Sequence, residues 1–427
     1  MAVPKIRFPE FTDDWEQRKL FEMATFSKGS GYSKADLAPS GTPIILYGRM
    51  YTKYETIIKE VDTFAEEKAG SVYSKGGEVI VPASGETAED ISRASVVENT
   101  GVLLGGDINI IHPNDNLIPG FLALTISNGN QQKKLSAKAQ GASIVHLHNE
   151  DLKDVDILYP TIAEQRKISE FFQGLDDTIT LHQRKLDDLR LLKKSMLQKM
   201  FPKEGKDVPE TRFPGFTDAW EQRKLGSISE IKTGPFGSTL HADDYVTDGI
   251  PIITTEHFKN GDLPTSKNGL PQVSDEDYKR LSSYVLNEGD IVFSRVGSVD
   301  INALVMPSQR HWLFSGRVLR VRPDMVNDPQ FLHTVLETET IKADIRSRAV
   351  GQTMPSINTE ILNETLVMMP QLRAEQEQIG QFFYSLNKTI TLHQRKRDDL
   401  KDLKRVFLYR ISLKSPSRRR IWQDELL

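Results

Sequence analysis

Two stretches of the chain, 164 to about 200 and 375 to about 411, carry apolar residues at the seven-residue spacing of packed helices. Neither stretch contains an internal proline, and each has a single glycine near its beginning. Apolar residues at this spacing form one stripe along a helix, through which the helix packs against another. The pattern therefore predicts two long helices, each about 55 Å in length, that pack against each other.

The predicted contact between the helices is a seam of heptad positions that we expect to be buried. His182 and His393 occupy the same seam position in the two helices, where a polar side chain can fix the register of the pair. The alternative is a half-exposed histidine whose ring lies against the seam. The seam residues are Ile168, Phe172, Leu175, Ile179, His182, Leu186 and Leu189 in the first helix and Ile379, Phe383, Leu386, Ile390, His393 and Leu400 in the second.

Outside these stretches, the apolar residues of regions 21–160 and 226–370 come in short Val/Ile runs bounded by Gly and Pro. Such runs are typical of β-strands. Each region is therefore predicted to be a mixed α/β domain, and the chain as a whole belongs to the α+β class. The expected strands include 43–45, 77–81, 251–253 and 289–293, and the expected helices include 118–127.

The whole pattern occurs twice. Residues 4–20 return as 209–225 with most positions identical, and 178–185 recur unchanged as 389–396. Two copies at this long spacing exclude a solenoid, which needs several short repeats, and predict an internal pseudo-twofold repeat. The predicted divisions are a repeated segment (1–20), a first domain (21–160), a central helix and spacer (161–206), a second repeated segment (207–225), a second domain (226–370), a C-terminal helix (371–411) and a divergent tail (412–427).

The composition is that of a soluble globular protein, with 38% apolar and 27% charged residues among 427. The absence of cysteine and of any long apolar run favours a cytoplasmic protein without membrane contact. A net charge of −4 argues against nonspecific coating of nucleic acid, so any DNA contact must be local. Lysine and arginine do cluster in 183–206 and 394–420, either as solvated helix faces or as local contacts.

The residues that follow corresponding strands differ sharply between the two regions. Segments 47–49, 82–87 and 143–148 of the first have unrelated sequences at 254–257, 294–298 and 353–358 of the second. Loops on a rigid scaffold commonly carry binding specificity, so one scaffold would present two different surfaces. Neutral drift of the loops after duplication is the alternative explanation.

Taken together, several motifs point to one family. They are the paired Trp-Glu-Gln-Arg-Lys-Leu segments at 15–20 and 220–225, the Glu-Gln pairs 164–165 and 375–376 that follow Pro160 and Pro370, Gly234-Pro-Phe-Gly-Ser238, Gly289-Asp-Ile-Val-Phe-Ser-Arg295 and Gly351-Gln-Thr-Met-Pro-Ser-Ile-Asn358. With these motifs in this order and largely duplicated, the chain resembles the specificity (S) subunit of type I restriction-modification systems over almost its whole length. The tail 412–427 has no counterpart in the first copy, so docking of a partner there is in doubt.

The resemblance implies a non-catalytic subunit that binds double-stranded DNA. Two target-recognition domains, joined by two long antiparallel helices, would each read one half of a split, asymmetric sequence. Two modification (M) subunits would bind S-adenosylmethionine and methylate adenine at N6, and two restriction (R) subunits would use ATP and Mg²⁺ for translocation and cleavage. No cofactor is expected on this chain. Helices of about 55 Å exceed one turn of B-DNA, about 34 to 36 Å, which suits half-sites about a turn apart.

Enzymatic motifs are missing from the sequence. There is no Gly-rich S-adenosylmethionine loop, no Asn/Asp-Pro-Pro-aromatic motif and no Walker motif. His146 and His148 suggest a metal pair, but their counterparts Ser356 and Asn358 are not typical transition-metal ligands. Two alternatives stay open: a structural coiled-coil tether whose domains bind proteins, and a methyltransferase with disguised motifs.

The candidate base-reading residues are polar residues on the divergent loops, because Arg can pair with guanine and Asn or Gln with adenine in the major groove. Arg295 and Gln352 are the strongest candidates, since both follow scaffold elements and have long side chains. The first domain contributes Lys28, Ser30, Tyr32, Lys34, Tyr47, Arg49, Ser84, His146 and His148, and the second contributes Lys232, Ser238, Thr254, His257, Lys259, Arg295, Ser298, Arg317, Gln352, Thr353 and Asn358.

Overall fold

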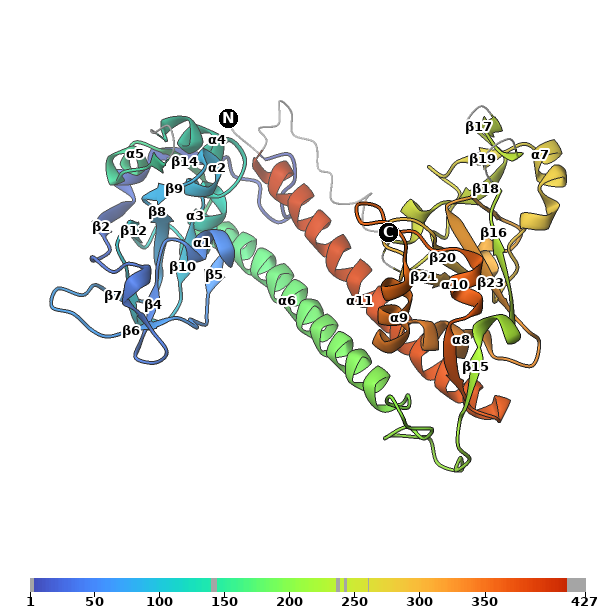
Figure 1. The fold of residues 1–427 in the computed structure, drawn as a ribbon. Coiled ribbons are helices and arrows are strands. Elements are labelled where there is room, and N and C mark those ends of the chain that lie inside the picture. Colours follow the sequence, from blue (N-terminus) through green and yellow to red (C-terminus); the bar gives the residue numbers. More distant parts are fainter. Residues whose placement is uncertain (1–3, 140–143, 236–238, 242–243, 260, 413–427) are drawn as a thin grey trace. The chain divides into compact units, whose positions relative to one another are not determined.

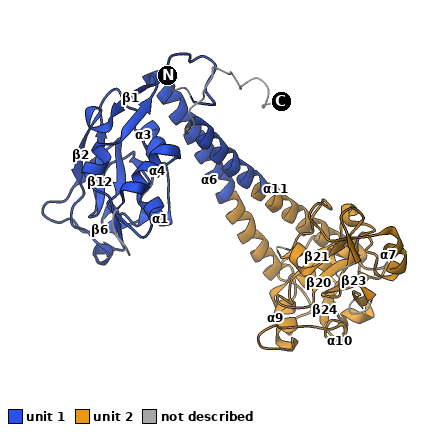
Figure 2. Cartoon of the chain, turned by 90° about the horizontal axis from the view of Figure 1, so that it is seen from above, with its two compact units in different colours: residues 1–183, 395–427 blue, residues 184–394 orange. Residues whose placement is uncertain are grey.

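The computed structural model describes residues 4–139, 144–235, 239–241, 244–259 and 261–412 (Figure 1). By its internal contacts the chain divides into two compact units, coloured separately in Figure 2. The first unit consists of 1–183 with 395–427, and the second of 184–394. Each unit therefore contains one globular domain together with part of each long helix.

The domain of the first unit is built on two sheets, with strand orders β2-β12-β8-β10-β5 and β3-β6-β4-β11-β7. In the first sheet β12 pairs antiparallel with both β2 and β8, and in the second β4 and β11 run parallel. The strands are β2 (Ala24–Lys28), β12 (Ile108–Pro113), β8 (Glu78–Pro82), β10 (Ser95–Val97), β5 (Ile57–Ile58), β3 (Leu37–Ala38), β6 (Phe64–Ala65), β4 (Thr42–Ile45), β11 (Thr100–Leu104) and β7 (Tyr73–Lys75).

Short helices and two strand pairs complete this domain. The helix α3 begins with a proline at its first position, where the missing N–H is harmless, and is buried on almost every side. The remaining elements are α1 (Arg49–Thr52), α2 (Ala88–Ile91), α3 (Pro119–Ile126), α4 (Gly129–Lys138) and α5 (Asn149–Lys153), with β9 (Ser84–Gly85) paired to β13 (Val145–His146) and β1 (Glu16–Lys19) paired to β14 (Asp156–Tyr159).

The domain of the second unit follows the same plan, with strand orders β16-β23-β20-β21 and β17-β19-β18-β22 and a separate pair β15-β24. Its strands are β15 (Glu221–Lys224), β16 (Ser229–Thr233), β17 (Tyr245–Val246), β18 (Ile250–Ile253), β19 (Gln272–Val273), β20 (Ile291–Ser294), β21 (Asn302–Leu304), β22 (Leu313–Phe314), β23 (Val318–Pro323) and β24 (Leu366–Met369), and its helices are α7 (Asp275–Arg280), α8 (Pro329–Leu336), α9 (Glu339–Arg348) and α10 (Thr359–Asn363). The predicted strands and the predicted helix at 118–127 are confirmed, with ends that differ by one or two residues.

The two predicted long helices are α6 (Ile162–Lys199) and α11 (Arg373–Ser412). In the first unit Lys404 donates to Asp176 at 2.5 Å and Arg397 donates to Gln183 at 2.7 Å. Seven residues forward on α6 thus correspond to seven backward on α11, so the helices are antiparallel. In the second unit, Arg190 of α6 donates to Gln394 of α11 at 2.7 Å.

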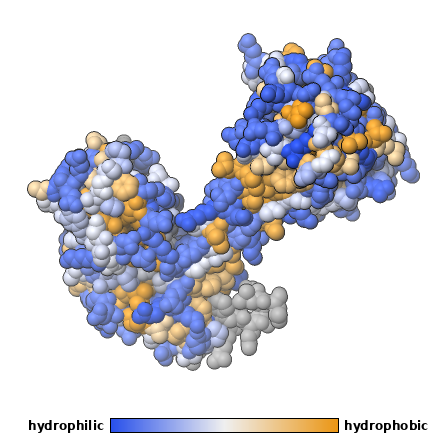
Figure 3. Space-filling model, turned by 90° about the horizontal axis from the view of Figure 1, so that it is seen from below, coloured by the Kyte–Doolittle hydropathy of each residue, from blue (hydrophilic) through white to orange (hydrophobic). Residues whose placement is uncertain are grey.

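Every predicted seam residue is buried or half-buried, His182 and His393 among the half-buried ones. Ile168 and Phe172 belong to the same hydrophobic core as Trp15 and Phe121 of the first domain, so the end of the seam packs on the domain as well as on the other helix. Other apolar side chains of the helices face outward, and Figure 3 shows hydrophobic residues on exposed helical surface. Within the described part of the chain, no helix combines the length and apolarity needed to cross a membrane.

A buried ion pair attaches each repeated segment to the first turn of a long helix. Arg7 donates two hydrogen bonds to Glu164, at 2.7 and 2.6 Å, and Arg212 donates two to Glu375, at 2.6 and 2.7 Å. Both carboxylates are almost completely buried, and they lie near helix N-termini, where the helix dipole favours negative charge. The identical residues of the two segments therefore make identical contacts.

The glutamine that follows each of these glutamates joins the helix to the domain. Gln165 accepts a hydrogen bond from the Ile118 N–H and donates to the Pro160 carbonyl, both at 2.9 Å. Gln376 does the same with the Asp328 N–H and the Pro370 carbonyl. The Glu-Gln pair of the sequence thus has a structural role in both units.

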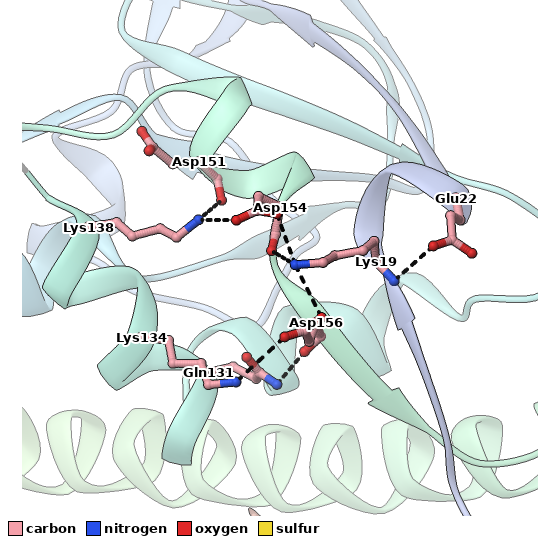
Figure 4. A network of polar contacts seen from close by, with 8 residues as sticks. All are labelled: Lys19, Glu22, Gln131, Lys134, Lys138, Asp151, Asp154 and Asp156. Atoms are coloured by element: carbon pink, nitrogen blue, oxygen red, sulfur yellow. Dashed lines mark hydrogen bonds and ion pairs between the residues drawn. The ribbon is translucent and has the colours of Figure 1, made fainter.

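The first unit also has an exposed polar network around β1 and β14 (Figure 4). Lys19 of β1 lies 2.9 Å from Asp154 and 3.3 Å from Asp156, and Lys138 of α4 lies 3.0 Å from Asp154. Hydrogen bonds from Lys19 and then Lys138 lower the pKa of Asp154 to about 2. The strands β1 and β14, which the sequence analysis assigned to segments 1–20 and 21–160, therefore belong to one surface of the same domain.

We expect Arg212→Met to destabilise the second unit by about 3–5 kcal/mol, because the Glu375 carboxylate would stay buried without its partner. Amide exchange measured along a urea titration reports the free energy of unfolding of this unit. The matched control is Arg223→Met, whose pair with Glu221 is exposed and should be worth less than about 1 kcal/mol. Equal effects of the two substitutions would contradict the anchoring role of the Arg212–Glu375 pair.

Candidate nucleic-acid interface

In the second domain, four loops that follow strand ends are joined to one another by backbone hydrogen bonds. We call this arrangement the loop frame. It brings together residues that are up to 123 positions apart in the sequence (357 − 234), all at one end of β18 and β20. The bonds run from the Gly234 N–H to the Val318 carbonyl (3.1 Å), from Ser315 to Ile253 (2.9 Å), from Arg295 to Arg317 (2.9 Å) and from Ile357 to Arg295 (2.9 Å).

The first domain has the same loop frame, bond for bond. Because these hydrogen bonds use only backbone atoms, the frame places few restrictions on side-chain identity. The corresponding bonds run from the Gly29 N–H to the Ile108 carbonyl (3.0 Å), from Gly105 to Ile45 (2.9 Å), from Ala83 to Asp107 (2.7 Å) and from Leu147 to Ala83 (3.0 Å).

The side chains on the two frames have different chemistry. Where the second domain has Arg295 and Arg317, the first has Ala83 and Asp107 at the corresponding bonds. The next positions along the fourth loop are His146 and His148 in the first domain and Ser356 and Asn358 in the second. The frame of the second domain therefore presents cationic side chains, whereas the frame of the first domain presents two imidazoles and a carboxylate.

Two predicted DNA contacts of the first domain have their polar groups engaged inside the protein. Tyr32 is buried, and its hydroxyl lies 2.6 Å from the Ser71 hydroxyl and accepts from the Lys68 N–H at 2.8 Å. Arg49 is also buried and donates to Asp62 (2.6 Å) and Glu55 (2.7 Å). Both side chains hold loops in place through these hydrogen bonds. Their roles as DNA contacts stay predictions.

Three of the other predictions meet beside the frame of the first domain. Ser84 is buried and its hydroxyl lies 3.1 Å from His146 Nδ1, whose exposed ring is parallel to that of His148 with centroids 6.4 Å apart. His148 is exposed and precedes α5 as its N-cap. The remaining predicted residues are distributed over nearby loops, with Lys28, Lys34 and Tyr47 exposed and Ser30 half-buried.

In the second domain, Lys232 and His257 are partly engaged by neighbours. Lys232 Nζ donates to the Ser283 carbonyl at 3.1 Å and lies 4.7 Å from the Tyr284 ring centroid. The Thr254 N–H donates to His257 Nδ1 at 3.1 Å, and burial lowers the pKa of His257, which favours the neutral imidazole. Lys259 is exposed and pairs with Glu256.

The other predicted residues of this domain lie on or next to its frame. Arg295 donates to the Gly316 carbonyl at 3.1 Å, which holds its side chain along the loop that carries Arg317. Asn358 accepts from the Ile361 N–H at 2.9 Å and so caps α10, which explains its identity independently of binding. Arg317, Ser298, Gln352 and Thr353 are exposed, and Ser238 lies outside the described residues.

Asp107 lies on the frame of the first domain but is not among the residues predicted from the sequence. This residue occupies the position that corresponds to Arg317 and has a left-handed backbone, with φ of 58°. Aspartate tolerates this conformation better than most residues, and the preceding Gly105-Gly106 pair was a turn signal in the sequence. Its carboxylate could accept a hydrogen bond from the N4 amino group of cytosine. None of the predicted first-domain residues has an anionic side chain that could do the same.

Comparison with known proteins identifies related sequences over most of the chain. The profile described as the type I restriction modification DNA specificity domain matches twice, at residues 12–191 and 217–402. The type I restriction enzyme MjaVIII specificity subunit of Methanocaldococcus jannaschii is 22% identical over 311 residues, which cover 69% of each chain. The MjaIX specificity subunit of the same organism is 21% identical over 297 residues, which cover 66% of this chain and 65% of the relative.

A solved structure has the same fold. The crystal structure of the type I restriction-modification system S subunit from M. genitalium aligns with a TM-score of 0.68, at 14% identity, and covers 97% of this chain and all of the other. The two profile matches agree with the internal repeat, and the aligned structure agrees with the predicted fold class of two α/β domains and long antiparallel helices.

We predict that Gly29→Ala destabilises the first unit by about 1–3 kcal/mol, the usual range for forcing atoms into a packed site. A Cβ at Gly29 would lie 1.9 Å from the Gly105 carbonyl oxygen, inside the loop frame. Gly31→Ala is the matched control, because its Cβ would meet nothing within 4 Å. Urea denaturation should separate the two variants, and equal stabilities would mean that the frame does not depend on close approach at Gly29.

Proposed function

Because the chain belongs to the family of type I restriction-modification DNA specificity domains, we propose that it reads a bipartite, asymmetric DNA target, one half-site per domain. The observation that carries this proposal is the loop frame, which is the same in both domains and presents different side chains. A shared backbone frame would approach DNA in the same way twice. Different side chains would then read different bases.

The second domain has the groups best suited to guanine. Arg317 is exposed, and Arg295 lies beside it; an arginine can donate two hydrogen bonds to guanine O6 and N7 in the major groove. Gln352 on the adjoining loop is exposed and suits adenine. In the first domain the corresponding readers are His146, His148 and Asp107, supported by Lys28 and Lys34 as phosphate contacts.

This chain acts as the addressing subunit and has no catalytic role of its own. Two M subunits would bind S-adenosylmethionine and methylate adenine at N6, and two R subunits would supply ATP- and Mg²⁺-dependent restriction. The complex would act in the cytoplasm, on double-stranded DNA.

A duplicated helical surface supports two copies of one partner. Within the identical segments 178–185 and 389–396, Leu181 and Leu392 are 66% and 65% exposed, although leucine is usually buried. Lys185 and Lys396, four residues further and hence on the same helix faces, are also exposed. Each copy therefore has the same exposed leucine beside a lysine. Two such patches are better explained as docking sites for two M subunits than as surface in contact with water.

The competing function is a coiled-coil tether whose domains bind proteins rather than DNA. Modification-sensitive long-read sequencing of DNA from cells with the chain and its M partner, against cells without the chain, separates the two. We expect a new N6-methyladenine motif with two short specified halves and a fixed gap. A soluble complex with M that yields no motif would indicate an inactive reader, and the absence of any complex would favour the tether.

Arg317→Ala should relax the specificity at one base position of one half-site. The lost hydrogen bonds between arginine and the base are worth about 1–3 kcal/mol of discrimination. The same sequencing experiment measures this as a degenerate position in the motif, with the other half-site unchanged. Lys279→Ala on α7, an exposed cation that takes no part in the hydrogen bonds of the frame, is the control and should leave the motif intact. A uniform loss of methylation at all sites would show that Arg317 does not read a base.

Replacement of Leu181 and Leu392 by serine should weaken binding of the M subunit while the chain stays folded, since both side chains are already in water. Analytical ultracentrifugation of mixtures with M would show loss of the fully assembled species. The control is Leu191→Ser: Leu191 is 68% exposed, but its counterpart in the second copy is Asp402, so it cannot belong to a duplicated site. Equal losses in the two variants would contradict a repeated docking patch.

A further inference from the structure

One loop of the second domain presents an exposed apolar side chain beside the loop frame. Met354 is 67% exposed and lies on the segment 351–355. Val350 and Ser356 close this loop with two mutual backbone hydrogen bonds, each 2.9 Å long. Gly351 has a φ of 103°, and a Cβ there would lie 2.9 Å from the Met354 carbonyl oxygen, so this turn requires glycine. The methionine is therefore carried by a tightly closed loop.

The same loop is attached to the frame on the far side of Met354. The Gly297 N–H donates to the Pro355 carbonyl at 2.8 Å, and the Ile357 N–H donates to the Arg295 carbonyl at 2.9 Å. A proline also restricts the residue before it to extended backbone conformations. The backbone around Met354 is thus held in place while its side chain lies largely in water. Such an arrangement lowers the entropy that would be lost on binding.

The first domain has an exposed apolar residue at the corresponding position. Ile144 lies three residues before the frame residue Leu147, as Met354 does in its own loop, and is 57% exposed. A single exposed apolar side chain is ordinary on a protein surface. Here, however, both copies have one at the same place, although the residues two positions further on, His146 and Ser356, have unrelated chemistry.

The surroundings of Met354 favour a nucleic acid as the partner of this side chain. Arg295 and Arg317 lie on the frame to which the loop is attached, and their charge favours phosphate groups. Among the groups that base edges present in the major groove, the C5 methyl of thymine is the apolar one. Methionine is flexible and polarisable, so it adapts well to a small apolar contact of this kind.

We propose that Met354 contacts the C5 methyl group of a thymine in one half-site, and that Ile144 makes the same kind of contact in the other. This inference rests on the proposed function and adds a hydrophobic contact to the polar ones described above. Arginine, glutamine, histidine and aspartate distinguish donors from acceptors, whereas an apolar side chain detects a methyl group. Each half-site therefore contains at least one A·T pair that is recognised through its methyl group.

Duplexes that contain deoxyuridine in place of thymine test this contact, because the replacement removes only the C5 methyl group. Each thymine of the motif found by methylation sequencing is replaced in turn, on either strand. Binding of the full chain in complex with its M partner is then measured by competition. We expect a position in each half-site at which deoxyuridine weakens binding about fourfold, the factor that corresponds to burial of one methyl-sized group.

Substitutions in the chain assign these positions to the two residues. Met354→Ala should abolish the sensitivity to deoxyuridine in one half-site only, and Ile144→Ala should abolish it in the other. Both side chains are largely in water, so neither variant should lose stability. The matched control is Met325→Ala: Met325 is 95% exposed between β23 and α8, and its replacement should leave both sensitivities unchanged. Sensitivity that persists in Met354→Ala at every position would overturn the proposal.

The same measurements separate this inference from the function on which it rests. If the parent complex prefers the motif to a scrambled duplex but tolerates deoxyuridine at every thymine, the methyl contact alone is wrong. If the parent complex does not distinguish the motif from the scrambled duplex, both the methyl contact and the proposed reading of DNA are wrong.

Discussion

Each unit depends on a buried ion pair between an arginine of the repeated segment and a glutamate in the first turn of a long helix. Arg7–Glu164 and Arg212–Glu375 are bidentate, and the carboxylates have almost no contact with solvent. A charge buried in this way is tolerated only with its partner in place, so the pair fixes where the helix begins relative to the strand pair of the same domain. The adjoining glutamine then fixes the helix to the loop before α3 or α8.

With the helix and domain joined in this way, the surface that we propose reads DNA can vary without loss of structure. The loop frame is built from backbone donors and acceptors, and the cores beneath it are Val/Ile-rich strands that are similar in both copies. Arg317 and Asp107 occupy corresponding positions with opposite charge, and neither change disturbs the hydrogen bonds of the frame. The backbone atoms of these residues therefore form the stabilising hydrogen bonds, while their side chains can differ between the two copies.

The sequence predicted what is periodic or repeated. Heptad spacing located α6 and α11 to within two residues at each end, and short Val/Ile runs located β4, β8, β18 and β20. It could not identify which polar loop residues have hydrogen-bond partners inside the protein. Arg49 binds Asp62 and Glu55, and Tyr32 binds Ser71; these partners come together only through the folded loops, and no local pattern announces them. Asp107 was not among the predicted residues, because only the folded frame places it opposite Ala83.

The chain order of the units has a consequence for synthesis. The second unit is one continuous stretch, 184–394, whereas the first combines 1–183 with residues after 394. Phe407, Leu408 and Ile411 pack against the core of the first unit, so that core stays incomplete while 211 intervening residues (394 − 184 + 1) are added. Since domains fold as they leave the ribosome, the second unit would finish first although it begins later. The amino-terminal domain would then expose its helix-facing apolar surface for about half of translation, which makes it the part of the newborn chain most in need of a chaperone.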